Sequence, residues 1–285
     1  MSGAFCAART LAELRARVHT WRASNERIAL VPTMGALHEG HVSLIEAARR
    51  SASRVIVSIF VNPRQFAPHE DFSRYPRDEA NDIATVADAG GHLVYAPVAA
   101  AVYPPGFATE IRLKGPAEGL ESKARPHFFS GVATVVTKLL LQAEPDVAVF
   151  GEKDYQQLKV VQRLVADLSI PVGILPVPIA RAADGLALSS RNVYLSAGER
   201  ARAPLLSATL RAVAARLASG ADAETACAEG ARALVEGGFA GVDYLTLRDA
   251  ETLEPLAQAD RPGRLLAAAR LGAVRLLDNW PVRPA

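Results

Sequence analysis

The feature that most constrains the fold of this chain is an alternation of short apolar runs with helical patterns over roughly the first 180 residues. The run Ile28–Val31 stops at Pro32, and apolar residues recur at helical spacing from Val42 onward. Similar patterns predict strands over 55–61, 92–96, 146–150 and 172–177, and helices over 10–23, 77–89, 131–142 and 155–168. This order predicts a Rossmann-like α/β domain, whose doubly wound parallel sheet carries helices on both faces.

The C-terminal part of the chain has a different order. Two Ala-rich helical stretches, 197–218 and 221–236, come before three strand-like segments at 242–247, 265–269 and 274–277. Helices followed by strands indicate a second, smaller α+β domain. We expect the boundary near Arg181, which divides the chain into residues 1–180 and 181–285.

Composition excludes several classes of protein. Lys and Arg number 32 against 30 Asp and Glu, whereas a general nucleic-acid binder normally carries a basic excess. Cys6 and Cys227 lie far apart without histidines at ligand spacing, which argues against a disulfide framework or a zinc site. No apolar run approaches the ~20 residues of a membrane helix, and residues 1–18 lack the apolar core of a signal peptide. We therefore expect a cytoplasmic protein that binds neither nucleic acid nor membrane.

The loop after the first predicted strand has a pattern suited to phosphate binding. It reads Pro32-Thr-Met-Gly-Ala-Leu-His-Glu-Gly-His41 and leads into a predicted helix, whose N-terminus presents unpaired N–H groups. The imidazoles of His38 and His41 can donate to one phosphate chain and stabilise charge during nucleotidyl transfer. The glycine spacing matches a P-loop, but His41-Val42 stands where that loop needs Lys and Ser or Thr. A tight turn with two surface histidines is the alternative interpretation.

A second polar segment, Phe150-Gly-Glu-Lys-Asp-Tyr-Gln-Gln157, also lies between a predicted strand and a predicted helix. The ammonium of Lys153 can pair with phosphate oxygens, and an acidic neighbour can help to hold Mg²⁺ or a ribose hydroxyl. Gln157 falls about one turn into the helix and is expected to face the same strand end. A solvated, charged helix cap would explain this segment in isolation, but its place at a second strand end favours function.

Two further loops complete the set. Asp184-Gly-Leu-Ala-Leu-Ser-Ser-Arg-Asn192 offers hydroxyls and a guanidinium that suit a mobile phosphate clamp. Phe60-Val-Asn-Pro-Arg-Gln-Phe66 places amide side chains at a strand end, where they could orient a polar substrate. An interdomain linker and a Pro-centred turn are the respective alternatives.

Together these segments resemble the motifs of the pantothenate synthetase family, in order and over nearly the whole chain. The matching segments are Val31-Pro-Thr-Met-Gly-x-Leu-His-x-Gly-His41, Val61-Asn-Pro-x-Gln-Phe66, Tyr75-Pro-Arg, Tyr103-Pro-x-Gly-Phe107, Phe150-Gly-Glu-Lys-Asp-Tyr-Gln-Gln-Leu158, Asp184-Gly-Leu-Ala-x-Ser-Ser-Arg-Asn192 and Leu276-Leu-Asp-Asn279. The His-x-Gly-His element is shared across a nucleotidyltransferase superfamily. The Gly-Glu-Lys-Asp-x-Gln-Gln and Asn-Pro-x-Gln-Phe elements are far more specific.

The resemblance implies an ATP-dependent ligase that condenses pantoate with β-alanine through a pantoyl-adenylate, releasing pyrophosphate and AMP. It implies ATP as a substrate, Mg²⁺ as a cofactor and a homodimer. Residues 1–180 would bind nucleotide and pantoate, and residues 181–285 would form a lid. The ligands of Mg²⁺ stay unassigned.

The resemblance also implies roles for individual residues. The catalytic groups would be His41, His38 and Lys153. The ATP site would comprise Met34, Gly35, Ala36, Leu37, His38, Glu39, Gly40, His41, Gly151, Glu152, Lys153, Asp154, Ala180, Leu188, Ser189, Ser190 and Arg191. Gln65 and Gln157 would bind pantoate, and Gln65 would contact β-alanine as well.

One departure from the family pattern lies near Arg125. The family reads Arg-Pro-x-His-Phe there, whereas this chain reads Arg125-Pro-His-Phe-Phe129. Phe128 thus occupies the place of the family's histidine, and we carry no polar active-site role onto it.

Two other functions compete with this one. A different nucleotidyltransferase of the same superfamily would transfer AMP or CMP to a phosphorylated acceptor, and would need cationic groups where Gln65 and Gln157 stand. A regulatory nucleotide-binding module without catalysis would not need histidine, lysine, serine and arginine together on the phosphates. Release of pyrophosphate in the presence of pantoate and ATP separates the three.

Overall fold

The computed structural model of the chain describes residues 6–67 and 70–284. Its contacts divide the chain into two compact units. The N-terminal unit comprises Met1–Glu152 and Val160–Pro178, and the C-terminal unit comprises Lys153–Lys159 and Ile179–Ala285. The short segment Lys153–Lys159 thus belongs with the C-terminal unit, although the strand before it belongs with the N-terminal one.

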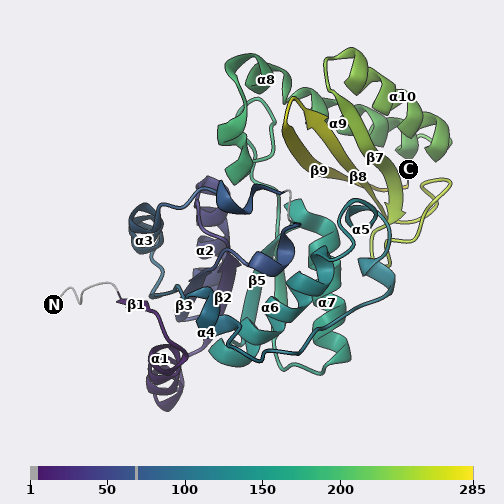
Figure 1. The fold of residues 1–285 in the computed structure, drawn as a ribbon. Helices are drawn as coiled ribbons and strands as arrows, with labels where there is room; N and C mark the ends of the chain where they lie inside the picture. Colours follow the sequence, from purple (N-terminus) through teal and green to yellow (C-terminus); the bar gives the residue numbers. More distant parts are fainter. Residues whose placement is uncertain (1–5, 68–69, 285) are drawn as a thin grey trace. The chain divides into compact units, whose positions relative to one another are not determined.

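The N-terminal unit is built on a six-stranded sheet of order β1-β4-β3-β2-β5-β6, in which every pairing is parallel (Figure 1). The strands are β1 (Cys6–Ala8), β2 (Ile28–Thr33), β3 (Arg54–Ile59), β4 (Leu93–Tyr95), β5 (Val147–Gly151) and β6 (Gly173–Val177). All four residues of Ile28–Val31 are fully buried, since both faces of the sheet are covered. Burial on both faces explains why this strand reads as an unbroken apolar run.

Helices cover both faces of this sheet. The helices of this part of the chain are α1 (Leu11–Ala23), α2 (Glu39–Ser51), α3 (Glu79–Asp88), α4 (Ala99–Val102), α5 (Glu121–Ala124), α6 (Phe128–Ala143) and α7 (Tyr155–Asp167), whose first residues, Tyr155–Lys159, belong to the C-terminal unit. On one face α2 packs over β2, β3, β5 and β6 with α3 beside it, and on the other α6 packs on β2 with α1 beside it. Single-turn 3₁₀ helices occupy several connections: η1 (Pro63–Gln65), η2 (Asp71–Ser73), η3 (Gly115–Ala117) and η4 (Glu152–Asp154).

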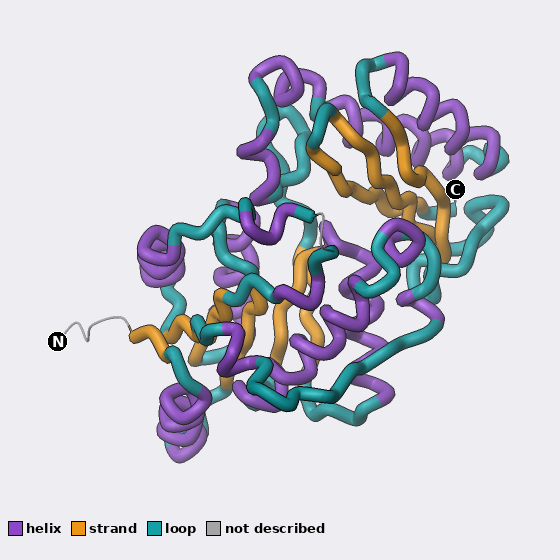
Figure 2. Tube along the Cα trace, viewed as in Figure 1, coloured by secondary structure: helices purple, strands orange, loops and turns teal. Residues whose placement is uncertain are grey.

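The C-terminal unit contains a three-stranded antiparallel sheet of order β7-β8-β9 (Figure 2). Its strands are β7 (Gly241–Asp249), β8 (Gly263–Leu271) and β9 (Val274–Val282). Helices α9 (Leu205–Ala218) and α10 (Ala223–Glu236) pack on each other and on one face of the sheet. The 3₁₀ helix η5 (Ser190–Tyr194) and the short helix α8 (Ala197–Arg202) precede them. The predicted fold class, a doubly wound α/β sheet with a smaller α+β part, is confirmed.

Two details differ from the sequence-based predictions. The stretch 197–218, predicted as one helix, is two helices, because Pro204 has no N–H to donate and stands as the N-cap of α9. Strand β1 was not predicted, since three residues are too short to show a periodic pattern. Among the described residues no helix is long and apolar enough to cross a membrane.

The turn after β7 yields a prediction about stability. Asp249 accepts the backbone N–H groups of Thr252 and Glu251, each at 2.8 Å, and pairs with Arg261, also at 2.8 Å. These hydrogen bonds, that from Thr252 foremost, lower its pKa to about 2. A depressed pKa means that the carboxylate stabilises the fold above its unfolded pKa and loses that contribution as the pH falls towards 2.

We therefore expect Asp249→Ala to lower the free energy of unfolding by about 2 kcal/mol at neutral pH. Urea unfolding of both proteins between about pH 7 and pH 3 measures this, and the difference should shrink at the acid end. A difference that stayed constant with pH would contradict the role of the carboxylate charge.

Candidate functional site

The order of the strands locates the switch point of the parallel sheet. From β2 the chain proceeds to β3 and β4 on one side, and β5 and β6 lie on the other side. Sheets of this kind bind ligands outside the carboxyl ends of the strands at such a reversal. Here the reversal falls between β2 and β5, so the segment after each of these strands is a candidate for ligand binding.

The segment after β2 is a strained loop held by its neighbours. Gly35 and Ala36 have φ values of 80° and 51°, both in the left-handed region. The Thr33 hydroxyl donates to the Ser58 carbonyl at 2.7 Å and accepts the Gly35 N–H at 3.2 Å. A side chain at Gly35 would be strained by its φ and would place Cβ 2.8 Å from the Asp82 carboxylate. Glycine at this position is therefore a requirement of the loop.

A buried carboxylate from α3 holds the same loop. Asp82 is 1% exposed and accepts the N–H of Ala36 at 2.9 Å and that of Leu37 at 2.7 Å. Burial raises the pKa of Asp82, and these two backbone hydrogen bonds oppose the rise. The carboxylate thus fixes the backbone immediately before His38.

His38 and His41 cap the first turn of α2 with their imidazoles. His38 Nδ1 accepts the Gly40 N–H at 3.1 Å, and His41 Nδ1 accepts the His38 N–H at 3.2 Å. This is the pattern of a capping box, with imidazoles in place of the usual hydroxyl and carboxylate. An Nδ1 atom that accepts carries no hydrogen, so each neutral ring carries its hydrogen on Nε2. With ring centroids 4.2 Å apart, the two histidines form a pair of Nε2–H donors.

A buried amide cluster follows β3. Asn62, 1% exposed, donates from Nδ2 to Gln65 Oε1 at 2.8 Å and to the Gly131 carbonyl at 3.1 Å. Asn62 Oδ1 accepts the Tyr103 hydroxyl at 2.8 Å. Because Gln65 Oε1 accepts from Asn62, the Nε2 group of Gln65 is the end of this amide that can donate to a ligand. The backbone of α6 approaches closely here, since a Cβ at Gly131 would lie 2.3 Å from the Arg64 carbonyl.

Phe128 supports this cluster as a packing residue. Its ring centroid lies 4.0 Å from the guanidinium carbon of Arg125. Arg125 Nη2 in turn donates to the Gln65 carbonyl at 2.9 Å and to Glu70 at 3.0 Å. The aromatic ring therefore steadies a guanidinium that holds the backbone of Gln65.

In the C-terminal unit, the segment Lys153–Lys159 lies on the small sheet. Lys153 Nζ is 3.4 Å from Asp154 Oδ1. The Tyr155 hydroxyl donates to the Ala250 carbonyl at 2.9 Å, and Lys159 pairs with Glu251 at 2.9 Å. Gln157 is half-buried in the first turn of α7.

The clamp loop, residues 180–192, is an ordered turn in the same unit. The Leu188 N–H donates to the Ala180 carbonyl at 3.0 Å, so these two residues lie side by side. Arg181 and Ala187 form a single antiparallel bridge next to them. Ser189 caps η5 and accepts the Arg191 N–H at 3.3 Å. Hydroxyls and the guanidinium of Arg191 thus follow directly on a fixed hairpin.

Comparison with known proteins identifies the family. The model of the family described as pantoate-beta-alanine ligase matches residues 7–281. The chain belongs to this family. It is 54% identical over 277 residues to a pantothenate synthetase of Caulobacter vibrioides, covering 96% of this chain and 97% of the relative. The resemblance drawn from the motifs is therefore confirmed.

Solved structures of this family share the fold. A pantothenate synthetase from Thermus thermophilus superposes with a TM-score of 0.90 at 45% identity, covering 98% of this chain and 100% of the other. A pantoate-beta-alanine ligase from Francisella tularensis superposes with a TM-score of 0.83 at 33% identity, covering 97% of each chain. That structure is described as a complex with beta-gamma ATP and beta-alanine.

The residues expected to form the site divide between the two units. The N-terminal unit carries Met34 to His41, Gln65, Gly151 and Glu152, and the C-terminal unit carries Lys153, Asp154, Gln157, Ala180 and Leu188 to Arg191. Within each unit, hydrogen bonds fix the backbone of several of these residues, as described above.

Asp82 is the residue that sequence reasoning missed. In the sequence it is one of several acids in the predicted helix 77–89. A signal was available, because Asp82 lies four residues before the buried Val86 and so on the same, inward face of α3. A carboxylate at a core position of a helix needs hydrogen-bond donors from elsewhere in the chain.

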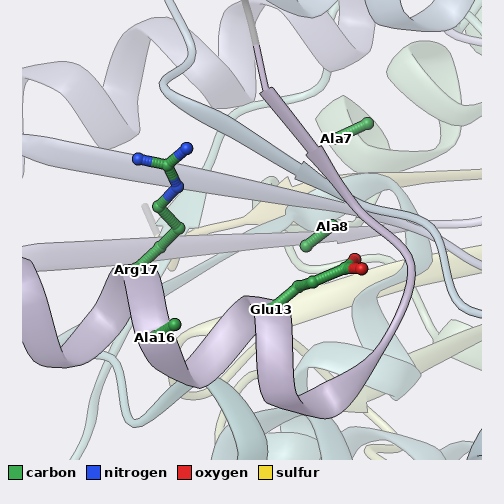
Figure 3. Close-up of a pocket in the computed structure, with 5 residues that line it drawn as sticks. All are labelled: Ala7, Ala8, Glu13, Ala16 and Arg17. Atoms are coloured by element: carbon green, nitrogen blue, oxygen red, sulfur yellow. The ribbon is translucent and has the colours of Figure 1, made fainter.

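A pocket lies between β1 and α1, apart from all these residues (Figure 3). It is lined by Ala7, Ala8, Glu13, Ala16 and Arg17. The carboxylate of Glu13 already accepts the N–H groups of Arg9 and Thr10 in the capping box of α1. We assign no ligand to this pocket.

Proposed function

We propose that this protein is a pantothenate synthetase, which uses ATP to activate pantoate and then joins the pantoyl group to β-alanine. The observation that carries the proposal is the pair of Nε2–H donors on His38 and His41, at the end of β2, in a chain that the ligase family model matches at residues 7–281. Two preorganised donors beside the N-terminus of α2 suit the charge that develops on a phosphate during nucleotidyl transfer.

The reaction would proceed in two steps. A carboxylate oxygen of pantoate attacks the α-phosphorus of ATP, forming a P–O bond while the bond to the β-phosphate breaks and pyrophosphate leaves. The β-alanine amine then attacks the acyl carbon, the C–O bond to AMP breaks, and the nitrogen loses a proton. His38, His41, Lys153 and Arg191 would stabilise phosphate charge, and positioning would supply much of the acceleration.

The amide cluster would orient pantoate. Asn62 fixes the side chain of Gln65 so that its Nε2 group can donate to an oxygen of the substrate, with a second amide at Gln157. Amides suit a hydroxy acid with one carboxylate, whereas a phosphorylated acceptor would need cations. This chemistry favours pantoate over the acceptors of other nucleotidyltransferases.

A divalent cation would accompany the nucleotide. Among the described residues no group of three or more His, Cys, Asp or Glu side chains could hold a metal ion. Mg²⁺ in such sites is held largely by phosphate oxygens and water, with one or two carboxylates at most. When bound, it would neutralise phosphate charge.

Family membership also supports the wider organisation that we propose. Residues 1–180 would bind ATP and pantoate, residues 181–285 would act as a lid, and the protein would work as a homodimer in the cytoplasm. Sedimentation of the purified protein tests the dimer, and a single monomeric species would contradict it.

One assay tests the function. AMP should form only when ATP, pantoate and β-alanine are all present, and pantothenate should appear in equal amount. Transfer of AMP to another acceptor, with pantoate inert, would replace this proposal by a different nucleotidyltransferase. Binding of ATP without any turnover would indicate a regulatory module.

The clamp loop gives a sharper prediction about ATP. We expect Arg191→Ala to weaken binding of ATP roughly 10- to 100-fold, since a charge-assisted hydrogen bond to the β- or γ-phosphate is lost. AMP lacks these phosphates, so its binding should change less than about 3-fold. Isothermal titration with a non-hydrolysable ATP analogue and with AMP measures both.

Arg200→Ala is the matched control for Arg191. It removes a cation that pairs with Asp184 of the same loop at 2.5 Å, without a proposed phosphate contact. Equal loss of ATP and AMP affinity in Arg191→Ala would place Arg191 away from the β- and γ-phosphates.

A further inference from the structure

We propose that Asp278 and Asn279, adjacent residues of β9, are positioning residues that fix Lys153 and the clamp loop with respect to each other. They end the segment Leu276–Asn279, to which the reaction described above assigns no role. The proposal rests on the proposed function, since it matters only if Lys153 and the clamp loop hold the phosphates of ATP. All of these residues belong to the C-terminal unit.

Asn279 connects β8 and β9 to the backbone of Lys153. Asn279 is 1% exposed, and its Nδ2 donates to the Lys153 carbonyl at 2.9 Å. Its Oδ1 accepts Arg264 Nε at 2.6 Å. Arg264 can only donate, so it fixes Oδ1 on its own side and leaves Nδ2 to face Lys153. The orientation of the Asn279 amide is therefore determined by its partners.

Arg264 is itself held in place. Asn279 pairs with Leu266 across the β8–β9 ladder, so Arg264, two residues earlier on β8, is a diagonal neighbour on the same face. The guanidinium carbon of Arg264 lies 4.2 Å from the ring centroid of Tyr155. Tyr155 follows Lys153 by two residues, and its hydroxyl is bound to Ala250. The segment that begins at Lys153 is thus attached to the sheet at two residues, Lys153 and Tyr155.

Asp278 holds the clamp loop. Its side chain is 2% exposed and accepts both terminal nitrogens of Arg181, at 2.7 and 2.8 Å. Arg181 also donates to the Gly185 carbonyl at 3.0 Å, across the hairpin that precedes Ser189. A bidentate pair fixes direction as well as distance, because both planar groups must align. The start of the clamp loop is therefore set by a buried carboxylate on β9.

The adjacency of the two residues explains how one strand can hold two segments. Successive side chains of a strand point to opposite faces of its sheet. Asp278 pairs with Ala267, which belongs to the core under α9 and α10, whereas Asn279 pairs with Leu266 in the opposite row. A buried carboxylate and a buried amide are costly in a small sheet unless they are fully bonded. The geometry points to one role for both residues: Asp278 and Asn279 maintain a fixed spacing between Lys153 and the clamp loop.

A double-mutant cycle tests the role of Asn279. Asn279→Asp keeps the shape and the bond to Arg264 but replaces the donor to Lys153 with a second acceptor. We expect kcat for AMP formation to fall roughly 10- to 100-fold, as a displacement of about 1 Å near the chemistry does. In a Lys153→Ala background the same change should alter kcat less than about 3-fold, because a residue that acts through Lys153 has nothing left to position.

Controls separate this idea from the proposed function. Arg275→Gln, on the same strand, removes a pair with Asp243 that reaches neither segment, and it should keep wild-type kcat. Asn279→Ala serves in the same cycle if Asn279→Asp does not fold. If the losses in kcat caused by Asn279→Asp and by Lys153→Ala multiply in the double variant, the positioning role is overturned. Wild-type kcat in Lys153→Ala would instead remove Lys153 from the proposed function.

Hydrogen exchange tests the role of Asp278. In Asp278→Asn, or in Arg181→Lys where the charge stays but the fork is lost, the amides of Ala182, Gly185 and Leu188 should exchange roughly 10-fold faster. Amides of α10 should be unchanged. Unaltered exchange in the clamp loop, or an equal rise in α10, would contradict a local positioning role.

Discussion

Replacement of His41 by alanine should lower kcat for AMP formation by roughly two to three orders of magnitude, the usual effect of removing one preorganised donor. Because His41 Nδ1 accepts the His38 N–H, the ring hydrogen of His41 is on Nε2. There it can donate to the transferring phosphoryl group. The negative charge on the phosphoryl oxygens is larger in the transition state than in bound ATP. The KM for ATP should therefore change much less than kcat.

The double role of His41 calls for a matched variant. His41→Ala also removes a cap from α2, which by itself would cost about 1 kcal/mol of stability. Glutamine at the same position of a capping box can accept the His38 N–H, so His41→Gln should restore the melting temperature while kcat stays low. Stopped-time assays of AMP and thermal melts of both variants measure this. Wild-type kcat in a folded His41→Ala protein would remove His41 from catalysis.

Much of the fold could be predicted because it depends on local pattern. The apolar run Ile28–Val31 is buried on both faces, and the helix predicted over 10–23 forms as α1. The break between α8 and α9 was missed because α8 buries no residue, so no apolar stripe in the sequence marks where α8 ends and α9 begins. Proline is tolerated at the start of a helix, so its presence alone did not decide between a kink and a new helix.

The candidate site shows where sequence reasoning ends. His38, His41 and Lys153 stand in short motifs at the ends of predicted strands, so their chemistry could be recognised without coordinates. The groups that hold these motifs come from far along the chain: Asp82 binds the loop at Ala36, and Asn279 binds the carbonyl of Lys153. Such pairings depend on how side chains from separate elements meet, which no local pattern specifies.

Asp82→Ala should produce the second large loss of activity, with kcat falling about 100-fold, although Asp82 is not expected to touch any substrate. The change leaves the N–H groups of Ala36 and Leu37 without the acceptor that Asp82 now provides. Loss of hydrogen bonds to a buried carboxylate costs about 1–3 kcal/mol, so the loop will shift to bring these N–H groups to water or to another acceptor. The shift displaces His38 and the first turn of α2, where the donors of the proposed reaction begin.

Stability measurements distinguish positioning from general damage. Burial raises the pKa of Asp82, so the folded protein binds this proton more tightly than the unfolded chain does. Ionisation of Asp82 therefore lowers stability as the pH rises above 3.8 towards the folded pKa. Asp82→Asn removes this titration and keeps one oxygen acceptor, so it should unfold with a weaker dependence on pH and retain more activity than Asp82→Ala.

Asp88 is an exposed acid of the same helix and provides the control. Asp88→Ala removes a carboxylate as well and should keep full kcat. If Asp82→Ala and Asp88→Ala both turned over at the wild-type rate, the loop would hold its shape without the buried carboxylate.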